Sequence, residues 1–220
     1  MRRIIVSAFM TLDGVVQAPG GPEEDPSGGF THGGWTVPYW DDVMGKAMDA
    51  ASAAPHDLLL GRRTYEIFAA HWPHSDEEPM ASKLNSAVKH VASRTLTRLD
   101  WQNARLIQGD VAEAVASLKR QDGPDLSVFG SGNLMQTLLA AGLVDEFLLW
   151  TFPLVLGTGK RLFANGTVPA ALELTASQVS TTGVMIGTYR LAGPVRTGSF
   201  ALAQPTEAEV ARRAAMSGDA

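Results

Sequence analysis

The chain has 220 residues, 45% of them hydrophobic, and its 18 basic and 23 acidic residues give a net charge of −5. This length and hydrophobic content fit one folded domain with a sizeable core. Because the basic residues are scattered along the chain, we expect no nucleic-acid partner. The absence of cysteine excludes disulfides, thiolate catalysis and cysteine-ligated metal sites, and it suits a reducing compartment.

The start of the chain favours a cytoplasmic protein. Met1, Arg2 and Arg3 precede a short apolar run at residues 4–6, whereas a secretory signal needs about 7 to 15 apolar residues. No apolar run in the sequence reaches the roughly 18 residues that a membrane-spanning helix needs. We therefore expect no membrane partner.

The first element is a strand, and a glycine-rich loop follows it. Residues 4–9 are β-branched and mostly apolar, which predicts a strand buried on both faces, as in a parallel sheet. The strand ends at a turn formed by Asp13 and Gly14. Residues 19–34 contain six glycines and three prolines. Because this composition offers little to bury, we expect a mobile loop that closes over the site.

Strands and helices alternate along the middle of the chain. Apolar runs predict strands at 57–60, 90–93, 126–129 and 147–156, and helical periodicity predicts helices at 41–53, 64–70, 80–89, 133–141 and after Asp110. This alternation predicts a mostly parallel sheet covered on both faces.

The end of the chain breaks the alternation. Residues 172–180 and 184–191, joined by a turn at Gly183, predict an antiparallel hairpin, which makes the sheet mixed. We expect a single domain over residues 1–202. Residues 203–220 are expected to form a weakly held tail with a short helix that Thr206 and Glu209 cap.

The most informative motif is a glycine turn between a strand and a helix, formed by Gly130, Ser131, Gly132 and Asn133. Glycines let the backbone approach a ligand closely, and a helix N-terminus offers free N–H groups to a pyrophosphate. The third glycine of the Rossmann fingerprint is missing, since Met135 stands there, which disfavours an ordinary Rossmann fold. A purely structural turn is the alternative.

Two further strand ends carry phosphate-binding chemistry. Gly61, Arg62 and Thr64 combine a turn with a guanidinium group and a hydroxyl, and Ser93 and Arg94 do the same after another strand. For the first junction the alternative is a solvated helix start with a salt bridge to Glu66. Three such junctions favour one nucleotide lying across the carboxyl edge of the sheet.

These motifs together resemble the dihydrofolate reductase and RibD C-terminal domain superfamily in order and spacing over residues 1–192. The resemblance rests on Thr11, Leu12, Asp13 and Gly14, on the segments 61–66 and 93–96, on Gly130, Ser131 and Gly132, and on the segments 143–146 and 153–157. It implies a three-layer α/β/α sandwich of the dihydrofolate reductase type, NADPH as the hydride donor, and a homodimer.

The resemblance also implies roles for individual residues. The cofactor-binding residues would be Gly61, Arg62, Thr64, Ser93, Arg94, Gly130, Ser131, Gly132, Asn133 and Leu134. Asp13 matches the acid near the nicotinamide and the substrate, with a plain Asp-Gly turn as the alternative. Asp41 and Asp42 are candidates for the acid that dihydrofolate reductase carries on its first helix, although they also fit helix-start acids.

Other features leave alternatives open. Thr158, in the segment 157–161 with Lys160 and Arg161, fits an anion-binding nest for a substrate phosphate, or a loop with solvated basic residues. Trp35 and Trp40 flank the loop and are expected to wall a substrate. For His71 and His74 we expect no metal, because Pro73 breaks the helix that would present both imidazoles.

The sequence therefore predicts an NADPH-dependent reductase that acts on a small pyrimidine-like or pterin-like substrate, similar to 5-amino-6-(5-phosphoribosylamino)uracil reductase. The alternative is a non-catalytic NADPH-binding or regulatory module on the same fold. An apolar segment predicts a dimer interface, since it holds more apolar residues than one sheet edge needs: Leu143, Val144, Phe147, Leu148, Leu149, Trp150 and Phe152.

Overall fold

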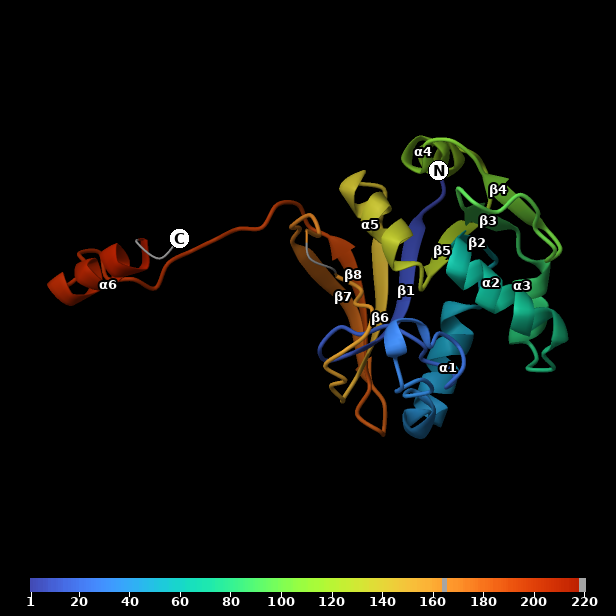
Figure 1. Ribbon diagram of the computed structural model, residues 1–220, viewed down its shortest axis with the longest axis horizontal. Coiled ribbons are helices and arrows are strands. Elements are labelled where there is room, and N and C mark those ends of the chain that lie inside the picture. The colour runs from blue at the N-terminus through green and yellow to red at the C-terminus, as the bar shows by residue number, and fades with distance from the viewer. Residues whose placement is uncertain (164–165, 218–220) are drawn as a thin grey trace.

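The computed structural model describes residues 1–163 and 166–217. Its strands are β1 (Ile4–Thr11), β2 (His56–Gly61), β3 (Lys89–Ala92), β4 (Ala104–Ile107), β5 (Asp125–Phe129), β6 (Glu146–Phe152), β7 (Leu172–Val179) and β8 (Met185–Leu191). Within the described residues they form one eight-stranded sheet in the order β4-β3-β2-β5-β1-β6-β8-β7. β1 therefore lies at the centre (Figure 1).

The sheet is mixed in the way the sequence predicted. β1 to β6 pair in parallel wherever they are neighbours. β8 pairs antiparallel with both β6 and β7, and Gly183, with a φ of 87°, stands in the turn that joins β7 to β8. The predicted antiparallel hairpin at the end of the sheet is confirmed.

Helices cover both faces of this sheet. They are α1 (Asp42–Ala51), α2 (Arg62–His71), α3 (Met80–Ser86), α4 (Val111–Arg120), α5 (Gly132–Ala140) and α6 (Glu207–Ser217), with short 3-10 turns η1 (Ser27–Gly29), η2 (Val37–Tyr39) and η3 (Trp72–His74). Gly142, with a left-handed φ of 64°, follows the end of α5, as is common for a glycine after a helix.

The core shows which helices cover which face. Leu59 of β2 packs in one cluster with residues of α4 and α5, whereas Leu58 and Leu60 pack with residues of α2 and α3. Successive residues of a strand point to opposite faces. On β6, Leu149 likewise packs with α4 and α5, and Trp150 with α1. α1, α2 and α3 therefore cover one face and α4 and α5 the other, which confirms the α/β/α sandwich.

Three element predictions need correction. The strand predicted at 147–156 is β6, and it ends at Phe152, because Pro153 has no N–H to donate to the sheet. The third helix ends at Ser86, since the chain joins β3 from Lys89 onward. β4 was missed because it is only four residues long and only partly buried.

The segment predicted to form a dimer interface is part of the core of one chain. Its apolar side chains are buried, or partly buried at Leu143 and Leu148, because β6 lies between β1 and β8 and is covered on both faces. Trp150 and Phe152 are fully buried, and Phe147 is 1% exposed. The segment therefore offers little apolar surface to a partner, and this reason for a dimer was wrong.

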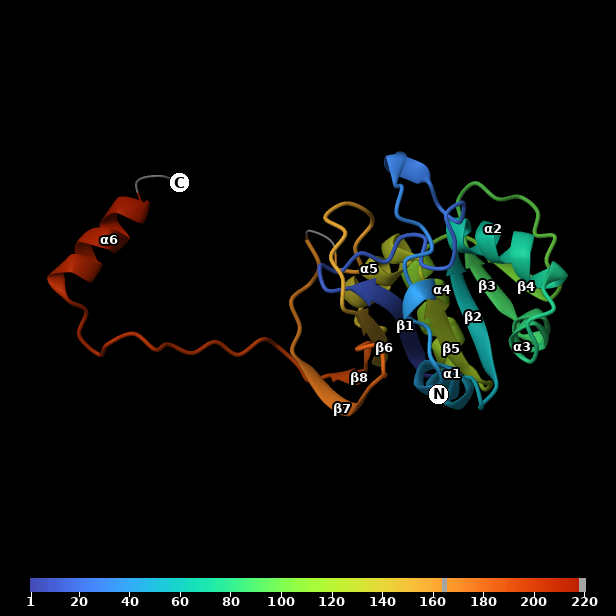
Figure 2. The ribbon, with the colours of Figure 1, turned by 90° about the horizontal axis from the view of Figure 1, so that it is seen from below.

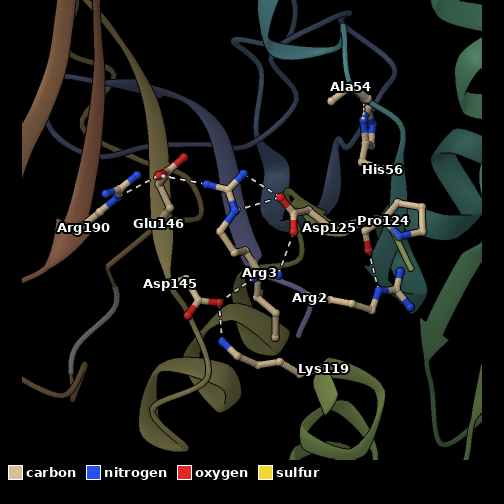
Figure 3. Close-up of polar contacts among 11 residues, drawn as sticks. Arg2, Arg3, Ala54, His56, Lys119, Pro124, Asp125, Asp145, Glu146 and Arg190 are labelled. Atoms are coloured by element: carbon tan, nitrogen blue, oxygen red, sulfur yellow. Dashed lines mark hydrogen bonds and ion pairs between the residues drawn. The ribbon is translucent and has the colours of Figure 1, made fainter. Parts of the chain in front are cut away.

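Ion pairs fasten the amino ends of the central strands. Arg3 contacts Asp125 of β5 (2.6 Å) and Glu146 of β6 (3.7 Å), and Glu146 also accepts a hydrogen bond from Arg190 of β8 (3.2 Å). Figure 3 shows Arg3 between the two carboxylates, with Arg190 on the other side of Glu146. This row of alternating charges holds β5, β1, β6 and β8 in register at the edge where β1 begins.

The carboxyl-terminal segment leaves the sheet after residue 193. Figures 1 and 2 show α6 at the end of an extended stretch, away from the sheet. The predicted cap is present, since Thr206 Oγ1 accepts the Glu209 N–H (3.3 Å). Residues 218–220 of the predicted tail lie outside the described residues. Among the helices described, none combines the length and the apolar character needed to cross a membrane.

Candidate functional site

Four parallel strands end side by side at one edge of the sheet. β2 ends at Gly61, β5 at Phe129, β1 at Thr11 and β6 at Phe152, and these strands are consecutive neighbours. The predicted junctions after β2 and β5 are therefore adjacent. Open α/β sheets bind ligands at the carboxyl ends of their strands, which makes this edge the candidate site.

Two hydrogen bonds join the turns after β2 and β5. The Gly61 N–H donates to Ser131 Oγ (2.9 Å), and the Ser131 N–H donates to Thr64 Oγ1 (3.1 Å). Ser131 and Gly130 both have a left-handed backbone, with φ of 52° and 51°. A Cβ at Gly130 would lie 3.0 Å from Thr64 Oγ1, so a larger residue would displace Thr64. The structure thus brings four of the predicted cofactor-binding residues together.

The same hydrogen bonds place two helix N-termini next to each other. α2 begins at Arg62 and α5 at Gly132. The first N–H groups of a helix lack intrahelical acceptors and carry a positive partial charge. Asn133 is exposed, whereas the Leu134 side chain is 6% exposed and packs in the core, so Leu134 offers a ligand only its backbone. The edge suits an anion such as a pyrophosphate.

The two arginines after Gly61 contact acceptors of the protein itself. Arg62 Nη1 lies 3.2 Å from Glu66 Oε1, and both side chains are exposed. This is the helix-start salt bridge that the sequence left open as an alternative. Arg63 donates to Ser27 Oγ (2.9 Å). An exposed ion pair one helical turn apart stabilises the fold by only about 0.3–0.5 kcal/mol. An anionic ligand could therefore replace Glu66 as the partner of the Arg62 guanidinium with little loss of stability.

The third junction, after β3, lies one strand further out. Ser93 Oγ accepts the N–H groups of Thr95 (3.2 Å) and Leu96 (3.0 Å), which fixes the turn. Arg94 is exposed, and within the described part of the chain no hydrogen bond or ion pair engages it. Since Ala92 pairs with Gly61, the Arg94 backbone lies close to the turn after β2.

Asp13 ties the end of β1 to the segment after β6. Its Oδ1 accepts the Thr11 hydroxyl (2.5 Å) and the Leu156 N–H (3.2 Å), and its Oδ2 accepts the Gly157 N–H (2.9 Å). The hydrogen bond from Thr11, more than any other cause, lowers the pKa of Asp13 to about 2. Asp13 is therefore an anion at neutral pH and not a proton donor. A direct contact with the substrate is still only a prediction.

Asp41 and Asp42 are both helix-start acids. Asp41 caps α1 by accepting the Met44 N–H (2.9 Å), and it accepts the Thr181 hydroxyl (2.6 Å) and the Thr182 N–H (3.1 Å) of the β7–β8 turn. The bond from Thr181 holds the pKa of Asp41 well below its usual range. Asp42 is exposed in the first turn. Asp41 thus joins α1 to the hairpin and offers no proton.

The segment 19–34 is fastened to the protein at several points, and its role as a mobile lid stays a prediction. The buried Gln17 amide donates to the carbonyl oxygens of Asp25 and Ser27 (both 2.9 Å), and Lys160 pairs with Asp25. Phe30 is only 7% exposed. These contacts come from Gln17 and Lys160, which lie outside the segment, so its composition does not reveal them. Gln17 was also missed, although a polar residue inside an apolar stretch is a signal of this role.

The segment 157–161 is fastened by its own basic residues. Arg161 Nε donates to the Asp13 carbonyl oxygen (2.9 Å), and Arg161 Nη2 donates to the Gly157 carbonyl oxygen (3.1 Å). Lys160 contacts Asp25 and Ser27. The basic side chains are thus bonded to the protein and are not simply solvated. Thr158 is exposed beside them.

The two tryptophans predicted to wall a substrate differ in their surroundings. Trp35 is 7% exposed, and its Nε1 donates to the Gln17 carbonyl oxygen (2.8 Å), so its indole is part of the core under the segment 19–34. Trp40 is 46% exposed and lies parallel to the fully buried Trp150. Of the two, only Trp40 borders solvent.

His71 and His74 were weighed as metal ligands. His71 Nε2 lies 3.6 Å from Glu77 Oε1. In residues 1–163 and 166–217, no group of three or more His, Asp or Glu side chains is gathered closely enough to hold a metal ion.

Comparison with known proteins identifies relatives over most of the chain. A family model described as the RibD C-terminal domain matches residues 2–186. The uncharacterized protein YyaP of Bacillus subtilis (strain 168) is 30% identical over 201 residues, which cover 87% of this chain and 96% of YyaP.

Solved structures share the fold at lower identity. A putative riboflavin biosynthesis protein from Shewanella sp. PV-4 superposes with a TM-score of 0.59 and 20% identity, over 86% of this chain and 98% of that one. A dihydrofolate reductase from Enterococcus faecalis, complexed with NADP(H) and RAB-propyl, superposes with a TM-score of 0.53 and 16% identity, over 86% of this chain and 96% of that one. These likenesses confirm the predicted dihydrofolate reductase-like fold.

We predict that Gly130→Ala destabilises the fold, because alanine at a left-handed φ of 51° is strained and its Cβ would press on Thr64. The loss should be about 1–2 kcal/mol in urea unfolding. Gly45→Ala is the matched control, since its Cβ in α1 would meet open space, and it should add about 0.5–1 kcal/mol. Equal effects of the two substitutions would contradict the account of this turn.

Proposed function

Because the chain belongs to the RibD C-terminal domain family, a family of reductase type, we propose that it is an NADPH-dependent reductase. Its substrate would be a small pyrimidine-like or pterin-like heterocycle, as for 5-amino-6-(5-phosphoribosylamino)uracil reductase. The observation that carries this proposal is the pair of helix N-termini that Ser131 holds together at the carboxyl edge of the sheet.

The residues of this edge fit a dinucleotide. Gly61, Gly130 and Gly132 have no side chains, so the backbone at these turns could approach the pyrophosphate closely. The N-termini of α2 and α5 would supply backbone N–H donors to it. Gly130 also keeps the two turns together, because a Cβ there would press on Thr64. When bound, NADPH supplies the hydride. The protein contributes binding, orientation and exclusion of water.

The charges on the outer side of this edge favour NADPH over NADH. The adenosine 2′-phosphate carries nearly two negative charges at neutral pH. Arg62 and Arg94 are exposed at neighbouring strand ends, and the Ser93 hydroxyl has a proton to donate while its oxygen accepts backbone N–H groups. A pocket for NADH would instead place an acid against the ribose hydroxyls.

On the inner side, Asp13 would position the reacting groups. Its carboxylate holds the segment 156–157 beside the end of β1, and Thr11 orients that carboxylate. Because Asp13 stays ionised, its role would be to orient the substrate or the nicotinamide carboxamide and not to donate a proton.

A second candidate function rests on the lack of an obvious proton donor. Asp13 is ionised and Asp41 is used as a helix cap, so neither acid supplies a proton to a reduced ring. This favours a non-catalytic NADPH-binding or regulatory module on the same fold, which would bind the cofactor without turnover.

We further propose a homodimer that forms through β7. All eight residues of β7 are exposed, and they include Leu174 and Val179. Its outer edge pairs with no strand in the described residues. An uncovered edge strand offers free N–H and C=O groups to a second chain.

The first test is whether NADPH is oxidised. The purified chain should consume NADPH, read at the absorbance of the reduced nicotinamide, when it is offered a panel of pyrimidines, pterins and quinones. Tight NADPH binding without oxidation by any of them would support the non-catalytic module. No binding of NADPH at all would contradict both functions.

The second test concerns the choice of cofactor. We expect NADPH to bind more tightly than NADH, and Arg62→Ala and Arg94→Ala each to weaken NADPH binding roughly 10- to 150-fold, because each removes a charge-assisted hydrogen bond. NADH binding should change much less. Arg98→Ala is the control, since Arg98 pairs with Asp100 in the exposed segment after Ser93. If Arg94→Ala weakens both cofactors equally, this pocket assignment is wrong.

The third test concerns assembly. Light scattering at micromolar concentration should give the mass of a dimer, since a stable interface buries roughly 1,200 Å² or more in total. Leu174→Glu should shift the mass toward the monomer, because it places a charge on the exposed edge strand. Val37→Glu should not, although Val37 in η2 is even more exposed than Leu174, at 62% against 51%. A wild-type monomer would refute the dimer.

A further inference from the structure

Trp150 carries a buried hydrogen-bond donor without an acceptor. The residue lies in β6 and is fully buried. Its indole Nε1 has no hydrogen-bond partner, which is true of only one other buried side-chain nitrogen or oxygen in the described residues, His90 Nε2. Buried donors are nearly always paired, and leaving one unpaired costs free energy. The unpaired Trp150 N–H is therefore a candidate for a function, such as a hydrogen bond to a ligand.

Trp40 is the ring beside Trp150 that borders solvent. The two indole rings are nearly parallel, at 10°, with their centroids 6.4 Å apart. This separation is large for stacked rings, so Trp40 overlaps Trp150 along an edge and not over its centre. Phe9 lies edge-on to both rings, 5.5 Å from Trp150 and 6.1 Å from Trp40. Because Trp40 is 46% exposed, it is the side chain of the three that can swing outward.

These rings lie near the proposed cofactor turn. Trp150 pairs with Phe9 two residues before both strands end at the candidate site. β1 is the single strand between β6 and β5, and Gly130 follows β5. Neighbouring strands are about 4.8 Å apart, so the Trp150 backbone lies roughly 10 Å from the Gly130 turn across the sheet.

The start of α1 determines where Trp40 stands. Trp40 lies between η2 and α1, and its N–H donates to the Val37 carbonyl oxygen (3.3 Å). The next residue, Asp41, is held by the α1 cap and by the β7–β8 turn. The Trp40 backbone is therefore fixed, and uncovering Trp150 requires only a rotation of the Trp40 side chain.

We propose that Trp150 is a specificity-determining residue whose indole N–H reads a hydrogen-bond acceptor on the substrate. A planar heterocycle with a ring carbonyl or an unprotonated ring nitrogen displaces the Trp40 ring, packs against Phe9, and accepts the Trp150 Nε1–H along its edge. A flat ring without an acceptor leaves the donor unpaired and binds weakly. This inference rests on the proposed function, since it describes the substrate of that reductase.

The test uses lumazine, a planar pteridine with two ring carbonyls, and indole, a planar ring without an acceptor, as probes of the full chain with NADPH present. The five tryptophans give five indole N–H signals in a ¹⁵N-labelled sample, and the one absent from Trp150→Phe belongs to Trp150. Lumazine should move this signal strongly downfield, as a new hydrogen bond does, and indole should not.

Binding constants give a second measurement. Trp150→Phe should weaken lumazine binding roughly 3- to 10-fold, as expected for one neutral hydrogen bond, and leave NADPH binding unchanged. Trp40→Ala should strengthen lumazine binding, because the ring no longer needs displacing. The wild-type spectrum keeps the test decisive even if Trp150→Phe folds poorly, since the Trp150 signal is then identified by through-bond assignment of the wild type.

The outcomes separate this inference from the proposed function. If lumazine leaves the Trp150 signal in place, or binds equally to Trp150→Phe, the inference is overturned even if NADPH is oxidised by another substrate. If the signal moves downfield while NADPH is never oxidised, Trp150 reads an acceptor in a protein that is not a reductase.

Discussion

The reciprocal hydrogen bonds between Gly61, Thr64 and Ser131 are the contact on which the candidate site depends. They join two turns that are 70 positions apart in the chain, and they do so at the only edge where α2 and α5 can both point their N-termini at one ligand. The left-handed backbone at Gly130 and Ser131 makes this geometry possible. An anion bound there would meet donors whose positions are fixed by the sheet itself.

At the opposite edge of the sheet, ion pairs and not glycine turns hold the strands together. Arg2 is buried against Asp57, and Arg3 lies between Asp125 and Glu146. These pairs fix the amino ends of the strands, while the carboxyl ends carry the turns of the proposed site. The ion pairs and the proposed binding site thus lie at opposite edges of the sheet, as parallel sheets with crossover helices permit.

Much of the fold could be predicted, because the strand and helix patterns and the turn residues in the sequence agree with the structure. The burial of individual residues and the partners of their side chains could not be predicted, because these depend on distant parts of the chain. The glycines at residues 130–132 predict the turn there, and the two strand patterns joined by Gly183 predict the antiparallel hairpin at the end of the sheet. The packing of the segment 19–34 depends on Gln17 and Lys160, which no composition reveals. Lys89 was assigned to a helix, yet its buried ammonium donates to the Asn85 and Gln102 carbonyl oxygens. The apolar run around Trp150 suggested an interface, because a sequence does not show how many strands flank a strand.

The central place of β1 has a consequence for the newly made chain. β1 is synthesised before both of its neighbours in the sheet, which come much later in the chain: Ile4 pairs with Leu126, and Ile5 with Glu146. At a synthesis rate of about 5–20 residues per second, β1 waits roughly 6 to 24 seconds for β5 to be made. Throughout that time the apolar residues of β1 have no neighbouring strand to pack with, and the backbone of β1 is hydrogen-bonded only to water. The nascent chain therefore exposes an apolar segment until its second half has emerged.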